Sequence, residues 1–342
     1  SPAKITLVHK LKLNRGACGL ADYLRLYNDG LIFYKFMHSI FLKLSIASGV
    51  EMALIDAVAN SIRVPLWRLF GGATNSVTTD ITIPIVSPDA AAGLAANYQK
   101  KGFTTLKLKV GKDLNADIEV LRAVRVAHPT CSFILDANEG YTAPEAIGVL
   151  EKFHEMGLAP ILFEQPVHRD DWEGLCHVSH VAKGRYGVSV AADESCRSLE
   201  DAYKIIEGNL AHVINIKLAK LGVLGSLEVI EAARRAGLGL MIGGMVETRL
   251  AMGFSGHLAA GMGCFSFIDL DTPLLLSEDP VIGGYEVSGP VYKFTNARGH
   301  GGFLHWDSIA CASPTPFKGV GRIAPDATVP GRIASHRARS AC

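Results

Sequence analysis

Residues 131–166 have the sequence CSFILDANEGYTAPEAIGVLEKFHEMGLAPILFEQP, and this stretch decides the fold. An apolar run at Phe133–Ala137 is followed by a segment with helical periodicity at Ala143–Met156 and by a second apolar run at Ile161–Gln165. Two strand-like runs separated by a helix of this length predict a parallel pair joined by a crossover helix. Each run also ends beside an acidic residue, so the strand ends become candidates for a functional site.

The same alternation continues in both directions along the chain. The runs expected as strands are Thr79–Val86, Thr105–Val110, Phe133–Ala137, Ile161–Gln165, Val188–Ala192, His212–Leu218, Gly239–Gly243 and Phe267–Leu270. Helical periodicity marks Pro88–Lys101, Ala116–His128, Ala143–Met156, Leu199–Glu207, Leu224–Ala236 and Thr248–Ala260. Eight alternating units favour a closed TIM-type barrel over an open sheet. Because no clear helix follows the eighth run, the predicted fold class is α/β, with a (β/α)7β barrel.

The two ends of the chain differ from this pattern. Val50–Ala59 has the periodicity of an amphipathic helix, and residues 64–72 (VPLWRLFGG) close it with a Pro and a Gly pair. Residues 1–46 show little strand alternation, and residues 313–342 are rich in Pro, Gly, Ser and Arg. We therefore expect an N-terminal region at 1–72, a barrel domain at 73–305 and a poorly ordered tail at 306–342.

Composition narrows the class of partner and the compartment. With 34 Lys and Arg against 33 Asp and Glu, the net charge is +1 and aromatics make up 8%, which gives no footprint of nucleic-acid binding. Seven cysteines without a CxxC pair favour a reducing compartment. Leu31–Val50 is interrupted by Lys35, His38 and Lys43, so we expect neither a membrane span nor a signal peptide. The prediction is a cytoplasmic protein, or one of an organelle such as a plastid, with a small-molecule partner; the oligomeric state, a homo-oligomer included, stays open.

Acidic residues end three consecutive predicted strands. They are Asp136, Glu164 and Asp193. In a parallel barrel the carboxyl ends of the strands meet at one mouth, where active groups lie. Three converging carboxylates repel one another unless a cation joins them, and an all-oxygen ligand set suits Mg²⁺. Three solvated loop acids are the alternative, but three in succession after apolar runs favour a magnesium site.

Lysines end the second and sixth predicted strands. Lys109 and Lys217 are four strands apart in a ring of eight, so we expect them to face each other across the barrel mouth. Lys107 points the same way as Lys109, because side chains on a strand alternate with a period of two. A lysine of lowered pKa can remove a proton beside a carboxylate that a metal polarises. The alternative is that these lysines reach solvent or pair with Glu194 and the metal carboxylates.

The eighth predicted strand ends in Asp269-Leu-Asp271, opposite the fourth strand and the metal site. Paired carboxylates there suit a substrate ammonium group, although one of them could instead cap the following loop. Glu247 follows the seventh strand, where we expect it to bond to Lys217 or to a neighbouring strand end. The histidines show no zinc spacing.

Taken together these motifs resemble the enolase superfamily, and within it the muconate lactonizing subgroup. Lys107-Leu-Lys109 is similar to the KxK motif, with Lys109 in the place of the catalytic base, and Lys217 matches the second catalytic lysine. Asp136, Glu164 and Asp193 match the metal ligands, with Asn138, Glu194 and Glu247 as supporting residues. The DLD at 269–271 resembles the DxD motif of dipeptide epimerases, whose aspartates hold an α-ammonium group. By the same analogy, Thr82 and Lys107 contact substrate.

The resemblance covers residues 47–305 and implies a function. It implies a Mg²⁺-dependent isomerase that epimerises dipeptides such as L-Ala-D/L-Glu by two-lysine 1,1-proton transfer through a metal-stabilised enediolate. Members begin with an α+β capping domain, of which only the last helix, near Val50–Gly72, is recognisable here, so we expect a remnant or truncated capping domain in residues 1–72. The alternatives are a cycloisomerase or o-succinylbenzoate-synthase-like lyase on the same scaffold, or an inactive truncated homologue.

Overall fold

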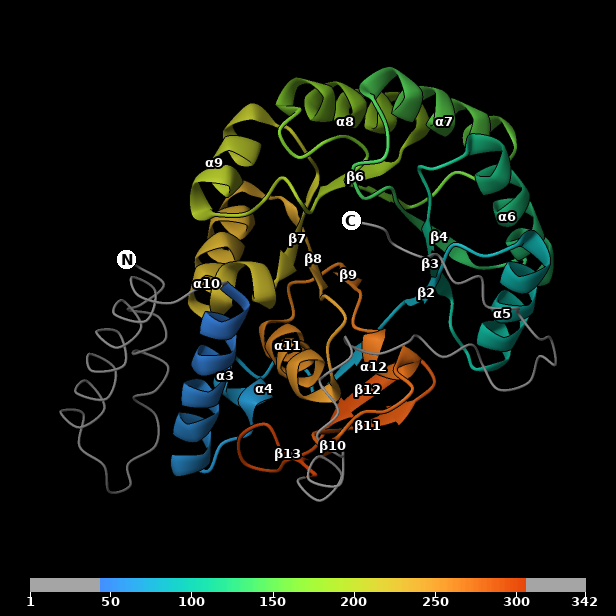
Figure 1. Ribbon diagram of the computed structural model, residues 1–342. Coiled ribbons are helices and arrows are strands. Elements are labelled where there is room, and N and C mark those ends of the chain that lie inside the picture. Colours follow the sequence, from blue (N-terminus) through green and yellow to red (C-terminus); the bar gives the residue numbers. More distant parts are fainter. Residues whose placement is uncertain (1–43, 306–342) are drawn as a thin grey trace, which may run out of the picture.

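The computed structural model describes residues 44–305, and eight parallel strands form its centre (Figure 1). They are β2 (Ile81–Ile83), β3 (Thr105–Lys109), β4 (Ser132–Asp136), β5 (Leu162–Glu164), β6 (Ser189–Ala192), β7 (Val213–Lys217), β8 (Gly239–Gly243) and β9 (Phe267–Ile268), paired in chain order. The main-chain amide of Asp80 donates to Ile268 O at 2.9 Å and joins the first strand to the last. The predicted α/β fold with a (β/α)7β barrel is confirmed.

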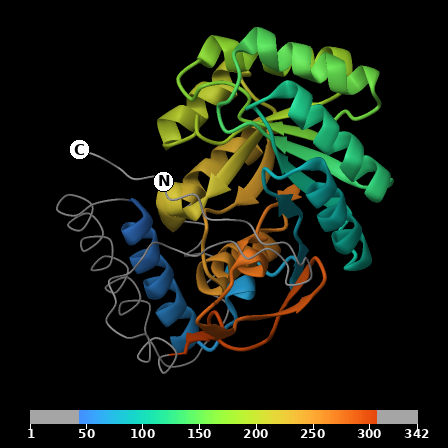
Figure 2. The ribbon, with the colours of Figure 1, turned by 45° about the vertical axis from the view of Figure 1, so that its right-hand side comes forward.

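A helix follows each of the first seven barrel strands, and the helices surround the strands (Figure 2). They are α5 (Pro88–Lys100), α6 (Leu114–Ala127), α7 (Ala143–Glu155), α8 (Trp172–Tyr186), α9 (Leu199–Gly208), α10 (Leu218–Ala236) and α11 (Arg249–Met262). Capping side chains set several starts: Ser87 and Asp171 accept first-turn amides, and Thr142 forms a capping box with Glu145. A short helix, α12 (Thr272–Leu275), follows the eighth strand.

Around this barrel lie α3 (Leu44–Ser61), α4 (Leu66–Leu69) and two small antiparallel sheets. One sheet consists of β1 (Ser76–Thr78), β12 (Val291–Phe294) and β11 (Tyr285–Ser288), and the other of β10 (Val281–Gly283) and β13 (Gly302–Leu304). The strand predicted at Thr79–Val86 is shorter in the structure, Ile81–Ile83, and ends at Pro84, which has no amide N–H to donate. Residues 76–78 before it pair with β12 in another sheet.

The helix predicted at Val50–Ala59 is longer in the structure and docks on the barrel as α3. It lies beside α10 in both views (Figures 1 and 2). Glu51 of α3 accepts the amides of Val223 and Leu224, just after Gly222, whose φ of 71° interrupts α10. In residues 44–305, no helix is both long and apolar enough to cross a membrane. The expectations for residues 1–43 and for the tail at 306–342 lie outside the described residues, and the domain division stays a prediction.

Candidate active site

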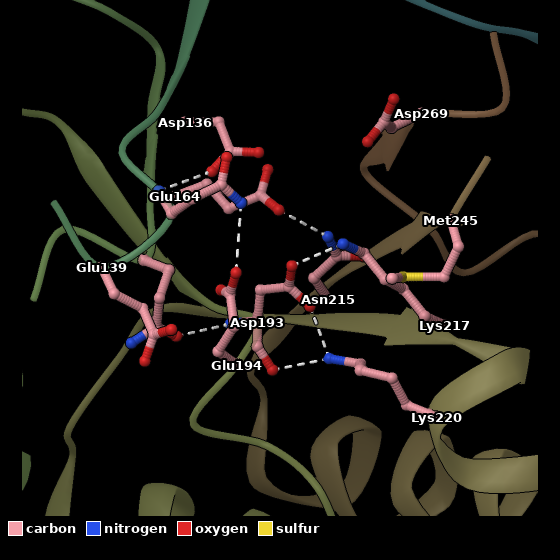
Figure 3. A network of polar contacts seen from close by, with 12 residues as sticks. Asp136, Glu139, Glu164, Asp193, Glu194, Asn215, Lys217, Lys220, Met245 and Asp269 are labelled. Carbon is pink, nitrogen blue, oxygen red and sulfur yellow. Dashed lines mark hydrogen bonds and ion pairs between the residues drawn. The ribbon is translucent and has the colours of Figure 1, made fainter. Parts of the chain in front are cut away.

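The three predicted metal ligands lie at the carboxyl ends of neighbouring strands. Asp136 ends β4 and pairs in register with Glu164, which ends β5, while Asp193 directly follows β6. Their exposed fractions are 0%, 0% and 1%. Figure 3 shows the three carboxylates around one polar network. In water such acids would be solvated loop residues; at this burial each needs a positive partner.

Two lysines of β3 supply positive charge on one side of the network. Lys107 Nζ lies 3.0 Å from Asp136 Oδ2, 2.8 Å from Glu164 Oε2 and 2.7 Å from Asp269 Oδ2. Lys109 Nζ lies 2.6 Å from Asp136 Oδ2, and its side chain is 32% exposed. Lys107 is therefore buried among three acids, whereas Lys109 reaches the open mouth.

Two further lysines hold Asp193 on the other side. Lys217, at the end of β7, places Nζ 2.5 Å from Asp193 Oδ2. Lys220 places Nζ 2.5 Å from Asp193 Oδ1 and 2.6 Å from the main-chain oxygen of Asp193. Sequence reasoning missed Lys220; its signal was its place in the first turn of α10, three residues after Lys217 at the end of β7. These contacts agree with the alternative considered from the sequence, in which the lysines pair with the metal carboxylates.

The pKa shifts follow from this arrangement. Burial and the carboxylate of Asp136 raise the pKa of Glu164 to about 7. Burial acts in the same direction on Asp193, but Lys220 and Lys217 outweigh it and hold the pKa of Asp193 well below its ordinary value. In turn Asp193 and Glu164 outweigh the effect of burial on Lys217 and raise its pKa. Glu164 is thus the acid least compensated by the lysines, and an added cation would relieve it.

The predicted supporting residues lie in the loops after the strands. Asn138 accepts from Lys109 Nζ at 2.8 Å and donates to Glu194 at 3.1 Å, with a backbone φ of 41°. Glu247 accepts the amide of Met245 at 2.8 Å, within its own loop after β8, instead of bonding to Lys217 as one expectation had it. Asn138 and Glu194 therefore link the β4 and β6 loops beside Lys109, and Glu247 orders the β8 loop.

Sequence reasoning also missed Gln165, which is fully buried and follows Glu164. Its Oε1 accepts the amides of Asp193 and Ser195 at 2.9 and 3.1 Å, and its Nε2 donates to Val167 O and Ser195 Oγ. The side chain therefore joins the ends of β5 and β6. No charge pattern pointed to it, because its role is to satisfy main-chain groups.

The strand-eight aspartates face the first and second barrel strands. Asp271 accepts the amide of Thr82 at 2.6 Å, and its side chain does not cap α12, so the loop-capping alternative is not observed. Asp269 pairs with Lys107. Among the described residues, one group of three acids has an oxygen atom from each member within 4.8 Å of the others: Asp80, Asp269 and Asp271, of which Asp80 was not predicted. The three predicted metal ligands are not drawn together as tightly as this group.

A hard cation fits the donor set on β4, β5 and β6. The groups offered there are carboxylate oxygen atoms from Asp136, Glu164 and Asp193, all buried, and no thiol or imidazole accompanies them in the network of Figure 3. Oxygen-only sets of this kind are typical of Mg²⁺ and Ca²⁺, and three carboxylates leave room for oxygen atoms of a substrate. The roles of the individual ligands stay a prediction.

A family model described as "Enolase C-terminal domain-like" matches residues 89–308. The chain belongs to this family. The resemblance inferred from the motifs is therefore confirmed at the level of the family, and the eight-stranded barrel is the fold expected of it.

Known relatives of this chain are epimerases. An L-Ala-D/L-amino acid epimerase of Populus trichocarpa is 76% identical over 265 residues, which cover 78% of this chain and 63% of the relative. An aromatic dipeptide epimerase of Herpetosiphon aurantiacus is 43% identical over 254 residues, 74% of this chain and 70% of the relative. A crystal structure of the dipeptide epimerase of Enterococcus faecalis V583, complexed with Mg and L-Leu-L-Tyr, superposes with a TM-score of 0.75 at 33% identity, covering 81% and 78% of the two chains.

Proposed function

We propose that this chain is a Mg²⁺-dependent epimerase of dipeptides of the L-Ala-D/L-Glu type, which moves a proton between the two faces of an α-carbon. The observation that carries the proposal is the placement of two lysines. Lys109 and Lys217 end β3 and β7, four strands apart in the order of eight, and each ammonium lies beside a different acid, Asp136 or Asp193. An α-carbon held between them has one lysine on each face.

Proton transfer by this pair needs one lysine to be neutral and the other charged. The base takes the α-proton onto its Nζ, and the opposite lysine returns a proton to the other face. In the structure Lys217 Nζ donates to Oδ2 of Asp193, so a cation held by Asp193 would compete with Lys217 for that oxygen. Lys220 Nζ also donates to the main-chain oxygen of Asp193, a contact that orients this residue without using its carboxylate.

Asp136, Glu164 and Asp193 are the residues that would hold Mg²⁺. The chemistry that the ion supplies when bound is stabilisation of negative charge on the substrate carboxylate as the α-proton leaves. The relative from Enterococcus faecalis was crystallised with Mg and a dipeptide, which supports the same cofactor and substrate class here.

The substrate site is proposed to lie at the mouth beside Lys109. A pocket of about 490 Å³ there is lined by residues that include Thr82, Lys109 and Asn138. A larger groove of about 890 Å³ lies on the outer surface between α8 and α9, away from the strand ends. We do not place the substrate there. Asp269 and Asp271 receive the amino group of the dipeptide.

The alternatives fit the buried charges less well. A cycloisomerase or an o-succinylbenzoate-synthase-like lyase acts on substrates without an amino group, so Asp269 and Asp271, 8% and 2% exposed, would lack that cation. Asp269 would keep Lys107, but Asp271 would keep only the uncharged amide of Thr82, which compensates a buried carboxylate less well than a cation does. An inactive homologue would have no need of both Lys109 and Lys217, and both are in place.

The test is a screen of a dipeptide library in D₂O with Mg²⁺, followed by mass spectrometry. An active epimerase adds a single deuterium at the α-carbon of its substrates, and chelator abolishes the gain. The pattern of exchanged dipeptides reports the side-chain preference in the same experiment. A folded, Mg²⁺-loaded protein that exchanges no dipeptide would refute the proposed function.

A further inference from the structure

A buried aspartate that the proposed mechanism does not use lies just before the first barrel strand. Asp80 is 3% exposed, and neither carboxylate oxygen has a hydrogen-bond partner. Its main-chain amide is fixed in the barrel wall by Ile268 O. Asp80 precedes Thr82 by two residues, so both side chains project from the same face of the strand. A carboxyl group buried without a donor is costly unless a proton or a cation accompanies it.

The side chain of Asp80 is aimed at the two aspartates of strand eight. One oxygen atom from each of Asp80, Asp269 and Asp271 lies within 4.8 Å of the others. The amide of Thr82 orients Asp271, and Lys107 orients Asp269. Burial and the charges of Asp269 and Asp271 outweigh the opposite effect of Lys107 and raise the pKa of Asp80 well above its ordinary value.

Three carboxylates around one small volume can accept the three N–H bonds of a primary ammonium group, one bond each. We propose that Asp80 is a third, specificity-determining acid of the amine subsite, so that Asp80, Asp269 and Asp271 each accept one N–H of the substrate amino group. The inference rests on the proposed function, because the amino end of a dipeptide is the cation concerned.

The surrounding charge favours an ammonium group over a second divalent ion. Lys107 Nζ already lies 2.7 Å from Asp269 Oδ2, so this cluster has a fixed positive neighbour. A divalent ion would meet about twice the repulsion from Lys107 that a monovalent ammonium group meets at the same distance. The ammonium group also has N–H donors, and one of them can form the hydrogen bond that the carboxylate of Asp80 lacks.

The experiment compares Asp80→Asn with a matched control, Asp171→Asn. Asp171 lies in the loop after β5, outside the group of Asp80, Asp269 and Asp271, where it caps α8 through Gly174 N, and asparagine caps equally well. The wild-type protein is first tested with L-Ala-L-Glu, L-Ala-L-Phe and L-Ala-L-Leu. The dipeptide that it exchanges fastest becomes the probe, together with the N-acetyl and N-methyl forms of that dipeptide. Affinities for the Mg²⁺-loaded proteins are measured by titration calorimetry, and Mg²⁺ affinity is measured alongside.

Asp80→Asn is expected to lower the affinity for the dipeptide by about tenfold or more. The affinities for the N-acetyl form and for Mg²⁺ should change by less than about twofold. Asp171→Asn should change none of them. An unchanged dipeptide affinity, or equal losses for the dipeptide and its N-acetyl form, would overturn the role of Asp80 while leaving the epimerase function standing. If the wild-type protein exchanges none of these three, the dipeptide that it exchanges fastest in the library screen replaces them; if it exchanges no dipeptide at all, the function itself fails and the inference falls with it.

A wild-type comparison decides the matter if Asp80→Asn does not fold. The N-methyl dipeptide keeps its positive charge but offers one N–H fewer, so one of the three carboxylates loses its donor. We expect it to bind about tenfold more weakly than the primary amine. Equal binding of the two would overturn the three-carboxylate subsite.

Discussion

Two layers of side chains inside the barrel come from the same strands and have opposite chemistry. The lower layer is an apolar cluster of Ile134, Leu162, Ala191, Val213 and Met241. Two residues further along four of these strands stand Asp136, Glu164, Asp193 and Asn215, which are equally buried. Because strand side chains alternate with a period of two, both layers point into the barrel at successive levels.

The contrast separates stability from chemistry along a single strand. On β5, Leu162 packs in the lower layer and gains from burial, since removing apolar surface from water is favourable. Glu164 is just as deeply buried, and its raised pKa records the cost of its desolvation beside Asp136. The apolar layer therefore stabilises the fold, whereas the buried acids of the mouth layer destabilise it. This is expected where the needs of function oppose those of stability.

The largest expected effect in the mouth layer concerns the two lysines. Lys109→Ala and Lys217→Ala should both abolish epimerisation, since the proton leaves one face and returns to the other. The remaining lysine can still exchange the proton on its own face, so each variant should exchange α-hydrogen in one epimer only, and the two variants should prefer opposite epimers. The loss of a general base costs about 10²–10⁴-fold in rate. Proton NMR of both epimers in D₂O with Mg²⁺ measures this.

Lys152→Ala is the matched control for the lysine variants. Lys152 lies on α7, where its side chain is 52% exposed beside Glu155, so its removal should leave the exchange of both epimers unchanged. Parent-rate epimerisation by either mouth variant, or exchange of the same epimer by both, would contradict the assignment of one lysine to each face.

A smaller effect is expected from a change of charge within the mouth. Glu164→Gln keeps the shape of the side chain but removes one of three carboxylate charges, so Mg²⁺ affinity should fall by about tenfold or more. Titration calorimetry gives the affinity, and excess EDTA should abolish the activity of the parent protein. Glu155→Gln, on the surface of α7, is the control. Equal Mg²⁺ affinity of Glu164→Gln and the parent would remove Glu164 from the ligand set.

The same two layers explain what the sequence could predict. The eight strands were recognisable because each is an apolar run bounded by turn residues, and the acids and lysines at their ends follow from the period of two. By contrast α8 was not among the predicted helices. Its buried residues include Gly174, Ser179 and Ala182, which give little apolar contrast along the helix.

Contacts between distant segments account for the rest. Residues 76–78 form β1 only because they pair with β12, more than 200 positions later in the chain. Gln165 and Asp80 lack a local signal for the same reason: Gln165 acts on the amides of Asp193 and Ser195, and Asp80 faces Asp269 and Asp271 across the barrel closure. Only the closed barrel brings such groups together.

The smallest expected effect on catalysis comes from the lower layer, where Leu162→Ala leaves a cavity in the apolar cluster. Leu162 is fully buried, and truncation of such a leucine costs about 2–5 kcal/mol of unfolding free energy. The strand should keep its position, because Ile161 N donates to Phe133 O and Gln165 N to Ala191 O on its two sides. Glu164, about 7 Å along the strand, then stays in place, so Mg²⁺ affinity and turnover per folded molecule should match the parent. Urea unfolding and single-temperature kinetics measure the two quantities. If Leu162→Ala weakens Mg²⁺ binding as much as Glu164→Gln does, the two layers are coupled and the separation of stability from chemistry does not hold.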